Sequence, residues 1–238
     1  MFLDDYLVRT MLLERLVGVL VYFVLVISIY NALKKCTSKK QFNLILNVCL
    51  IIIAVLSFIY IPSNDADLYR WRRITEGWQG VSFDAFFNEH LRNSMTPVAY
   101  LVMYLCAQIK IDGFLPALCS IVFYRNLFSI LKDYQLNEKE DNFQDKTSLA
   151  FFVFMSSGAF LEVISGIRCF VAFSFIAKSF YYEIYRERKM IRSIPAYIIA
   201  SLIHNAVIPI ICIRIFYMVF QRATNTKRKI LNTGVAIA

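Results

Sequence analysis

The side chains best suited to chemistry in this sequence are two carboxylates, followed closely by an aromatic residue and two arginines. They are Asp65, Asp67, Tyr69, Arg70 and Arg72, within the run SNDADLYRWRR. A carboxylate here could take a proton from a hydroxyl group, and the planar fork of an arginine suits a phosphate. An ordinary solvated segment, with its arginines at lipid headgroups, explains the same pattern, and both interpretations stay open.

Further polar residues lie within or between apolar runs, where an uncompensated charge is costly. Arg168 follows Gly166 in SGIRCFVAF; it could start a helix whose first N–H groups attract an anion, or extend its long side chain to the membrane surface. His204, in ASLIHNAVIP, could contact a substrate or act as a hydrogen-bonding partner within an apolar helix. For Arg214 we expect either extension to the surface or pairing with another residue.

The motifs of several common enzyme classes are missing from the sequence. It has no Walker loop, HExxH, GxSxG or strand-associated GxGxxG, so ATP hydrolysis, zinc proteolysis and serine-hydrolase chemistry have no support. His90 and His204 are the only histidines and cannot form a multi-histidine metal site. The six cysteines include no CxxC pair, and we interpret them as small buried hydrophobic residues. We therefore expect no metal and no cofactor.

Long apolar segments must position these polar residues. Of the 238 residues, 58% are hydrophobic and 18% are charged. A soluble domain averages about 45–50% hydrophobic residues and about 25% charged residues. The excess falls in blocks of about twenty residues, the length of a helix that crosses a ~30 Å hydrocarbon core. The expected segments are residues 16–33, 44–61, 97–109, 114–131, 148–164, 169–185 and 194–220. The sequence predicts an all-α, polytopic transmembrane helix bundle with about six or seven membrane segments in a single domain, residues 1–238.

The basic residues predict how these segments cross the membrane. The net charge is +9, but Lys and Arg lie in short segments between apolar blocks, and no basic face typical of nucleic-acid binding accompanies them. Four lysines within residues 34–40 predict a cytoplasmic first loop, so the polar stretch at about 62–96 is expected on the outer side. Strict alternation would then place the basic run RERKMIR outside. The conflict disappears if the short 97–109 block does not fully cross.

Several short motifs together resemble the EpsG family, Wzy-like membrane proteins linked to bacterial exopolysaccharide and capsule assembly. The motifs are DADLYRW, TPVAYLVMYL, GIRCFVAFSFIAKSFYYEIYRERK and IIASLIHNAVIPII. Family members typically show Asp then Tyr after an early span, a Gly-x-Arg stretch, and a later Ala-x-x-x-His, here Ala200 to His204. The resemblance covers roughly residues 43–213. Cys169 stands where the family usually has glutamine, and the chain ends before the last spans of most members, so we expect a C-terminal truncation.

The resemblance implies a multi-pass glycosyltransferase of the bacterial inner membrane. It would be a polymerase that joins undecaprenyl-diphosphate-linked oligosaccharide repeat units into exopolysaccharide or capsule, with the lipid bilayer and other polysaccharide assembly proteins as partners. The implied catalytic residues are Asp65, Asp67 and Arg168, and the implied substrate-binding residues are Tyr69, Arg70, Arg72 and His204. The alternatives are a lipid-linked sugar flippase or transporter subunit, and a non-catalytic assembly protein.

Overall fold

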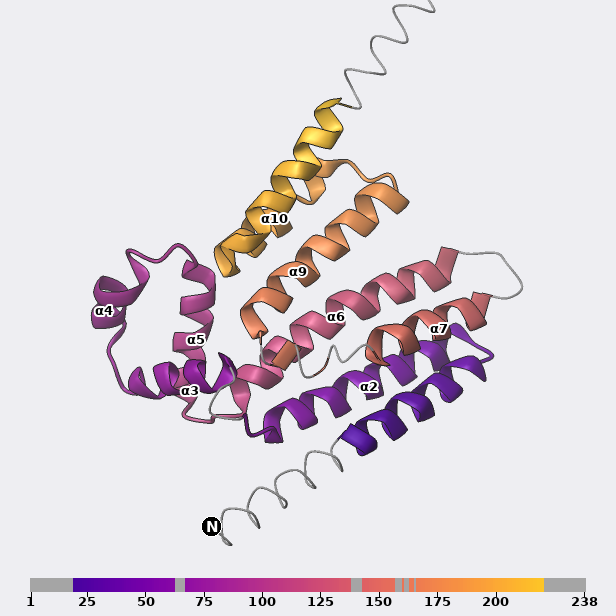
Figure 1. Cartoon of the computed structure of the whole chain (residues 1–238), viewed down its shortest axis with the longest axis horizontal. Coiled ribbons are helices and arrows are strands. Elements are labelled where there is room, and N and C mark those ends of the chain that lie inside the picture. Colours follow the sequence, from indigo (N-terminus) through magenta and orange to yellow (C-terminus); the bar gives the residue numbers. More distant parts are fainter. Residues whose placement is uncertain are drawn as a thin grey trace, which may run out of the picture. The chain divides into compact units, whose positions relative to one another are not determined.

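The structure of this chain, a computed structural model, is helical throughout its regular elements. It describes residues 19–62, 67–137, 143–156, 160, 163–164 and 166–220. All regular elements in these ranges are helices, which confirms the expected all-α class (Figure 1). The chain divides into two compact units, residues 1–74 with 111–167, and residues 75–110 with 168–238.

Five helices contribute to the first unit. They are the helix Val19–Lys34, α2 (Lys39–Ile59), most of α3 (Asp67–Gly77), α6 (Phe114–Asn137) and α7 (Phe143–Ser156). Helix α2 begins at Lys39, before the expected start at 44, and α6 continues to Asn137, beyond the expected end at 131. Both extensions contain lysine. In α2 the extension has a local cause, because the Ser38 hydroxyl caps the helix by accepting the Gln41 N–H at 3.2 Å.

Two pairs of polar side chains join α2 to α6, which lie side by side in Figure 1. In the first half of α2, Lys132 Nζ donates to Asn47 Oδ1 at 2.8 Å. Near its end, the buried hydroxyls of Ser57 and Ser120 lie 2.8 Å apart. Because position 47 pairs with 132 and position 57 with 120, the two helices run antiparallel.

The close approach of Gly113 to Phe58 fixes where the chain returns to this pair of helices. Gly113 directly precedes α6, and a Cβ at this position would overlap the Phe58 carbonyl group near the end of α2. Only a residue without a side chain allows this contact. The chain that leaves α2 therefore enters α6 at the same end of the first unit.

The helix Val19–Lys34 and α7 complete an antiparallel bundle. Tyr22 donates its hydroxyl to the Met155 carbonyl at 2.8 Å, and Lys34 Nζ lies 3.6 Å from Asp145 Oδ1. Helix α7 in turn packs against α6 through aromatic rings, including Phe151. The ion pair places the loop that follows the first helix and the start of α7 at one end of the unit.

The second unit is made of shorter helices. They are α4 (Phe83–Phe86), the π-helix Phe87–Leu91, α5 (Pro97–Ile109), α9 (Ile167–Phe180), the π-helix Tyr181–Tyr185, the 3-10 turns Met190–Arg192 and Asn205–Val207, α10 (Ile194–Ile203) and residues 208–220. Much of the expected polar stretch, about 62–96, is thus helical. Helix α5 has the expected bounds, because Pro97 suits a first turn and Lys110 ends the helix in a left-handed conformation at φ 60°.

The last expected segment, residues 194–220, is interrupted at His204. His204 is the C-cap of α10 and has an extended backbone at φ −153° and ψ 116°. Pro209 gives a physical reason for the break. Proline has no N–H to donate to the carbonyl of residue 205, and in a continuous helix its ring would clash with that carbonyl. The prediction that His204 lies inside an apolar helix is therefore wrong.

Two described helices, α2 and α6, are long and apolar enough to cross a membrane by length and composition. Helix α2 is apolar on both faces. Its exposed residues include Leu44, Val48, Ile51 and Val55, opposite the buried face that carries Leu46. A helix that is hydrophobic all round belongs in a protein core or a membrane, and this exposed face supports membrane association.

Candidate functional site

Helix α3 carries every described member of the predicted group Asp65, Asp67, Tyr69, Arg70 and Arg72. Leu68 and Trp71 are buried, whereas Arg70 is exposed, so the helix packs through one side and presents charge on another. Asp67 lies in the first turn, where a carboxylate interacts favourably with the helix dipole. The sequence thus forms a short surface helix at this point, and its amphipathic pattern sets which side chains face outward.

Asp67 holds two neighbouring side chains. Its Oδ1 accepts from Arg70 Nη2 at 2.8 Å, and its Oδ2 accepts from Trp71 Nε1 at 3.0 Å. Each carboxylate oxygen therefore already has a donor, and the side chain is 37% exposed. This arrangement orients Arg70, and the second lone pair on each carboxylate oxygen remains available to a hydroxyl group.

Arg72 connects α3 to the end of α2. Its Nη2 donates to the Tyr60 carbonyl at 2.8 Å, and Tyr60 is the C-cap of α2. A helix ends with carbonyl groups that lack intrahelical partners, so a guanidinium is a favourable partner here. Arg72 thus has a positioning role that the sequence pattern did not indicate.

The other predicted site residues are spread over the chain. Asp65 lies outside the described residues. Tyr69 is half-buried on α3 in the first unit. Arg168 is the second residue of α9, half-buried, and its Nε is fully buried. His204 is half-buried at the break after α10, and like Arg168 it belongs to the second unit. The structure thus joins Asp67 to Arg70 and confirms that Arg168 begins a helix; a common site for all these residues stays a prediction.

A buried cluster in the second unit was missed by the sequence analysis. Glu183 lies in the π-helix Tyr181–Tyr185, and its side chain is 1% exposed. Its carboxylate accepts from the Tyr197 hydroxyl at 2.6 Å and from Arg214 Nε at 3.0 Å. The pairing expected for Arg214 is confirmed. Glu183 could have been found as the one carboxylate inside the expected segment 169–185, since buried charges in apolar segments need partners.

The described geometry of the α3 surface suits anion binding. Within the described ranges, no group of three His, Cys, Asp or Glu residues is arranged to hold a metal ion. The α3 surface offers the exposed guanidinium of Arg70, oriented by Asp67, and such a fork can bind phosphate through two parallel hydrogen bonds. Comparisons with protein-family models, curated proteins and solved structures find no match to this chain.

Proposed function

We propose that this chain is a multi-pass protein of the bacterial inner membrane that polymerises lipid-diphosphate-linked oligosaccharide repeat units. The order of the motifs resembling the EpsG family supports this proposal. The observation that carries it is the charged surface of α3, where Asp67 orients Arg70 at the end of a helix long and apolar enough to cross a membrane. A phosphate-bearing substrate anchored in a bilayer would meet such a surface at the headgroup level.

The proposed topology uses five crossings. The helix Val19–Lys34, α2, α6, α7 and α9 would cross, whereas α5 would not. The segment 194–220 would enter the membrane and turn back at His204, because Tyr197 and Arg214, on either side of that residue, both bond Glu183. The return of the chain to the end of α2 at Gly113 supports this count. RERKMIR then lies in the cytoplasm, as the positive-inside rule favours.

In the proposed reaction, a hydroxyl of the acceptor sugar attacks the anomeric carbon of the growing chain. The carbon–oxygen bond to undecaprenyl diphosphate breaks, and the hydroxyl proton passes to a carboxylate. Asp65 or Asp67 would accept that proton or orient the hydroxyl. Arg168 would neutralise the charge that develops on the diphosphate, assisted by Arg70 or Arg72. Tyr69 and His204 would contact the sugars.

Replacement of Arg168 with alanine tests the proposal in a strain whose polymer depends on this gene. We expect the Arg168→Ala variant to accumulate in the membrane at the normal level while polymer chains are lost and single repeat units still appear outside. Arg92→Gln is the matched control, because Arg92 is an exposed arginine outside the proposed site. Polymer of normal length in the Arg168 variant would remove this residue from the mechanism. Accumulation of lipid-linked units inside the cell after gene deletion would instead indicate a flippase.

A further inference from the structure

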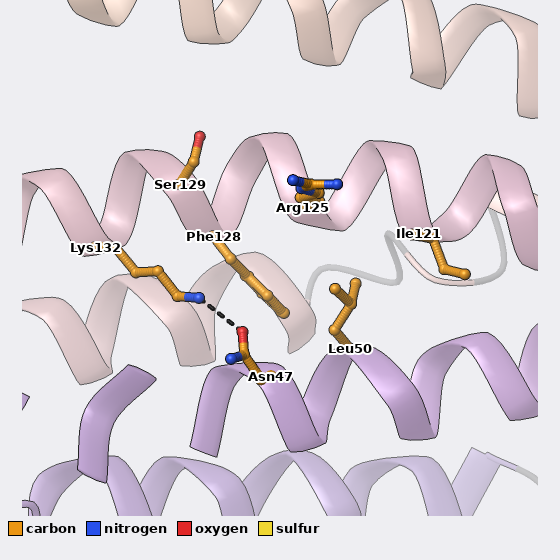
Figure 2. A pocket seen from close by; sticks show the side chains of 7 residues that line it. All are labelled: Asn47, Leu50, Ile121, Arg125, Phe128, Ser129 and Lys132. Carbon is orange, nitrogen blue, oxygen red and sulfur yellow. Dashed lines mark hydrogen bonds between the residues drawn. The ribbon is translucent and has the colours of Figure 1, made fainter. Parts of the chain in front are cut away.

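A pocket between α2 and α6 contains two cations and no acidic side chain. Its volume is about 430 Å³, and all its lining residues belong to the first unit. Figure 2 shows Lys132 extending from α6 towards Asn47 on α2, with Arg125 two turns earlier on α6. Leu50 and Phe128 supply an apolar wall. The pocket therefore has an apolar wall, and its charged side chains are both positive.

Unused N–H donors remain in this pocket on Asn47 and Arg125. Asn47 Oδ1 accepts from Lys132 Nζ at 2.8 Å, so the Asn47 amide nitrogen remains as a donor. The Ser129 hydroxyl is not such a donor, because it already donates to the Asn126 carbonyl at 2.6 Å. Arg125 makes no hydrogen bond or ion pair with any residue in the described part of the chain. A group of donors of this kind suits an anion with several oxygen atoms.

Such an anion would be attracted to the two cations on electrostatic grounds. Arg125 and Lys132 are seven residues apart, which places them on one face of α6, and their charges repel each other. Among the described residues, no carboxylate forms an ion pair with either side chain. Asp133 is adjacent to Lys132 in the sequence, but successive residues do not face each other on a helix. A bound anion would replace the repulsion with two attractive contacts.

The pocket is far from the α3 surface along α2. Asn47 is eight residues from the first residue of α2, or about 12 Å, and twelve residues from the last, or about 18 Å. The pocket is thus nearer to the lysine-rich loop than to α3. In the proposed topology this is the cytoplasmic half of the membrane. Val48 and Ile51, exposed on α2 beside the pocket, would there contact lipid chains.

We propose that Arg125 and Lys132 bind the phosphate headgroup of an anionic membrane lipid in this pocket. Basic pockets between membrane helices on the cytoplasmic side are suited to such headgroups, because the phosphate meets fixed cations while its acyl chains stay in the bilayer. The site is separate from the α3 surface and requires no sugar substrate. It depends on the proposed insertion of α2 and α6 in a bilayer and not on the proposed polymerase activity.

Lipid retention by the full chain tests this site. The protein is purified in mild detergent with phosphatidylglycerol or phosphatidylcholine, and bound lipid is counted by native mass spectrometry. We expect retention of phosphatidylglycerol, and a fall in affinity of about tenfold or more in the Arg125→Gln/Lys132→Gln variant, since each charged hydrogen bond is strong. Lys35→Gln/Lys40→Gln is the matched control, because it removes two exposed charges of the same unit outside the pocket.

Three outcomes would overturn the proposal. They are unchanged retention in the pocket variant, an equal loss in the control variant, and displacement of the lipid by the same concentration of inorganic phosphate. If the double variant does not fold, as judged by helix content and gel filtration, Arg125→Gln alone provides the test, because Arg125 is exposed and has no partner to lose among the described residues. The Arg168→Ala variant should retain the lipid, so failure of the polymerase proposal would be seen separately.

Discussion

Gly113 lies against the backbone carbonyl of Phe58, so the start of α6 touches the end of α2. Between these two contacts the chain passes through α3, α4 and α5. It leaves the first unit and returns to it at the same end. Any membrane crossings made by this intervening stretch must therefore be even in number, and α5 is the only apolar helix of ten or more residues described within it.

We expect Gly113→Ala to destabilise the pairing of α2 with α6. The added methyl group would overlap the Phe58 carbonyl, and forced separation of well-packed groups typically costs about 1–3 kcal/mol. Thermal unfolding of the purified protein measures the effect. Gly77→Ala is the control, because a Cβ there meets nothing within 4 Å. Equal melting temperatures for the two variants would contradict the close approach.

The proposed topology predicts that the two ends of α5 lie on the same side of the membrane. In a cysteine-free background, single cysteines replace Gln79 and Asp112, both exposed, and Lys40 in the first turn of α2. A membrane-impermeant maleimide added to intact cells should label positions 79 and 112 but not position 40. Labelling of only one of the two outer positions would mean that α5 crosses the membrane.

Loss of either charge of the Glu183–Arg214 pair should destabilise the second unit strongly. Removal of one partner of a buried pair typically costs about 3–5 kcal/mol, because the other charge remains buried. We expect Glu183→Gln and Arg214→Gln each to lower the melting temperature, and the double variant to lose less than the sum of the two. Additive losses would show that the two groups, 3.0 Å apart, are not coupled.

The Cys36 thiol should ionise only at high pH while the protein is folded. Cys36 lies between the first helix and α2 and is 3% exposed, and its burial raises the pKa of the thiol. Thiolate is the reactive form, so alkylation by iodoacetamide should reach its half-maximal rate at a higher pH in the native protein than in protein unfolded by SDS. A variant that keeps only Cys36 allows this measurement. Coincident pH profiles would contradict the effect of burial.

Local signals explain which parts of the fold could be predicted from the sequence. The bounds of α5 were predictable, because Pro97 suits a helix start and the polar residues from Lys110 end it. The start of α9 beside Arg168 followed from Gly166, which interrupts the apolar run. The early start of α2 was missed, because lysines at 39 and 40 were assigned to the loop although Ser38 caps the helix ahead of them.

Contacts between distant residues explain what could not be predicted. The hydrogen bond of Arg72 to the Tyr60 carbonyl joins a side chain to a backbone group. Every residue type has this carbonyl, so the residue at position 60 gives no indication of the bond. Glu183 and Arg214 meet only because the chain turns back after the π-helix and again at His204. Spacing indicated that charges were present, but tertiary structure decides which of them pair.

The carboxylate of Glu183 has a further consequence for how this protein is made. Glu183 leaves the ribosome 31 residues before Arg214, the cation that neutralises it. A nascent chain at that stage must keep Glu183 near water, protonated or beside a temporary partner. The helical segment that carries Arg214 must therefore be made before this carboxylate can be paired. A copy that lacks this segment would offer quality-control proteases an uncompensated charge.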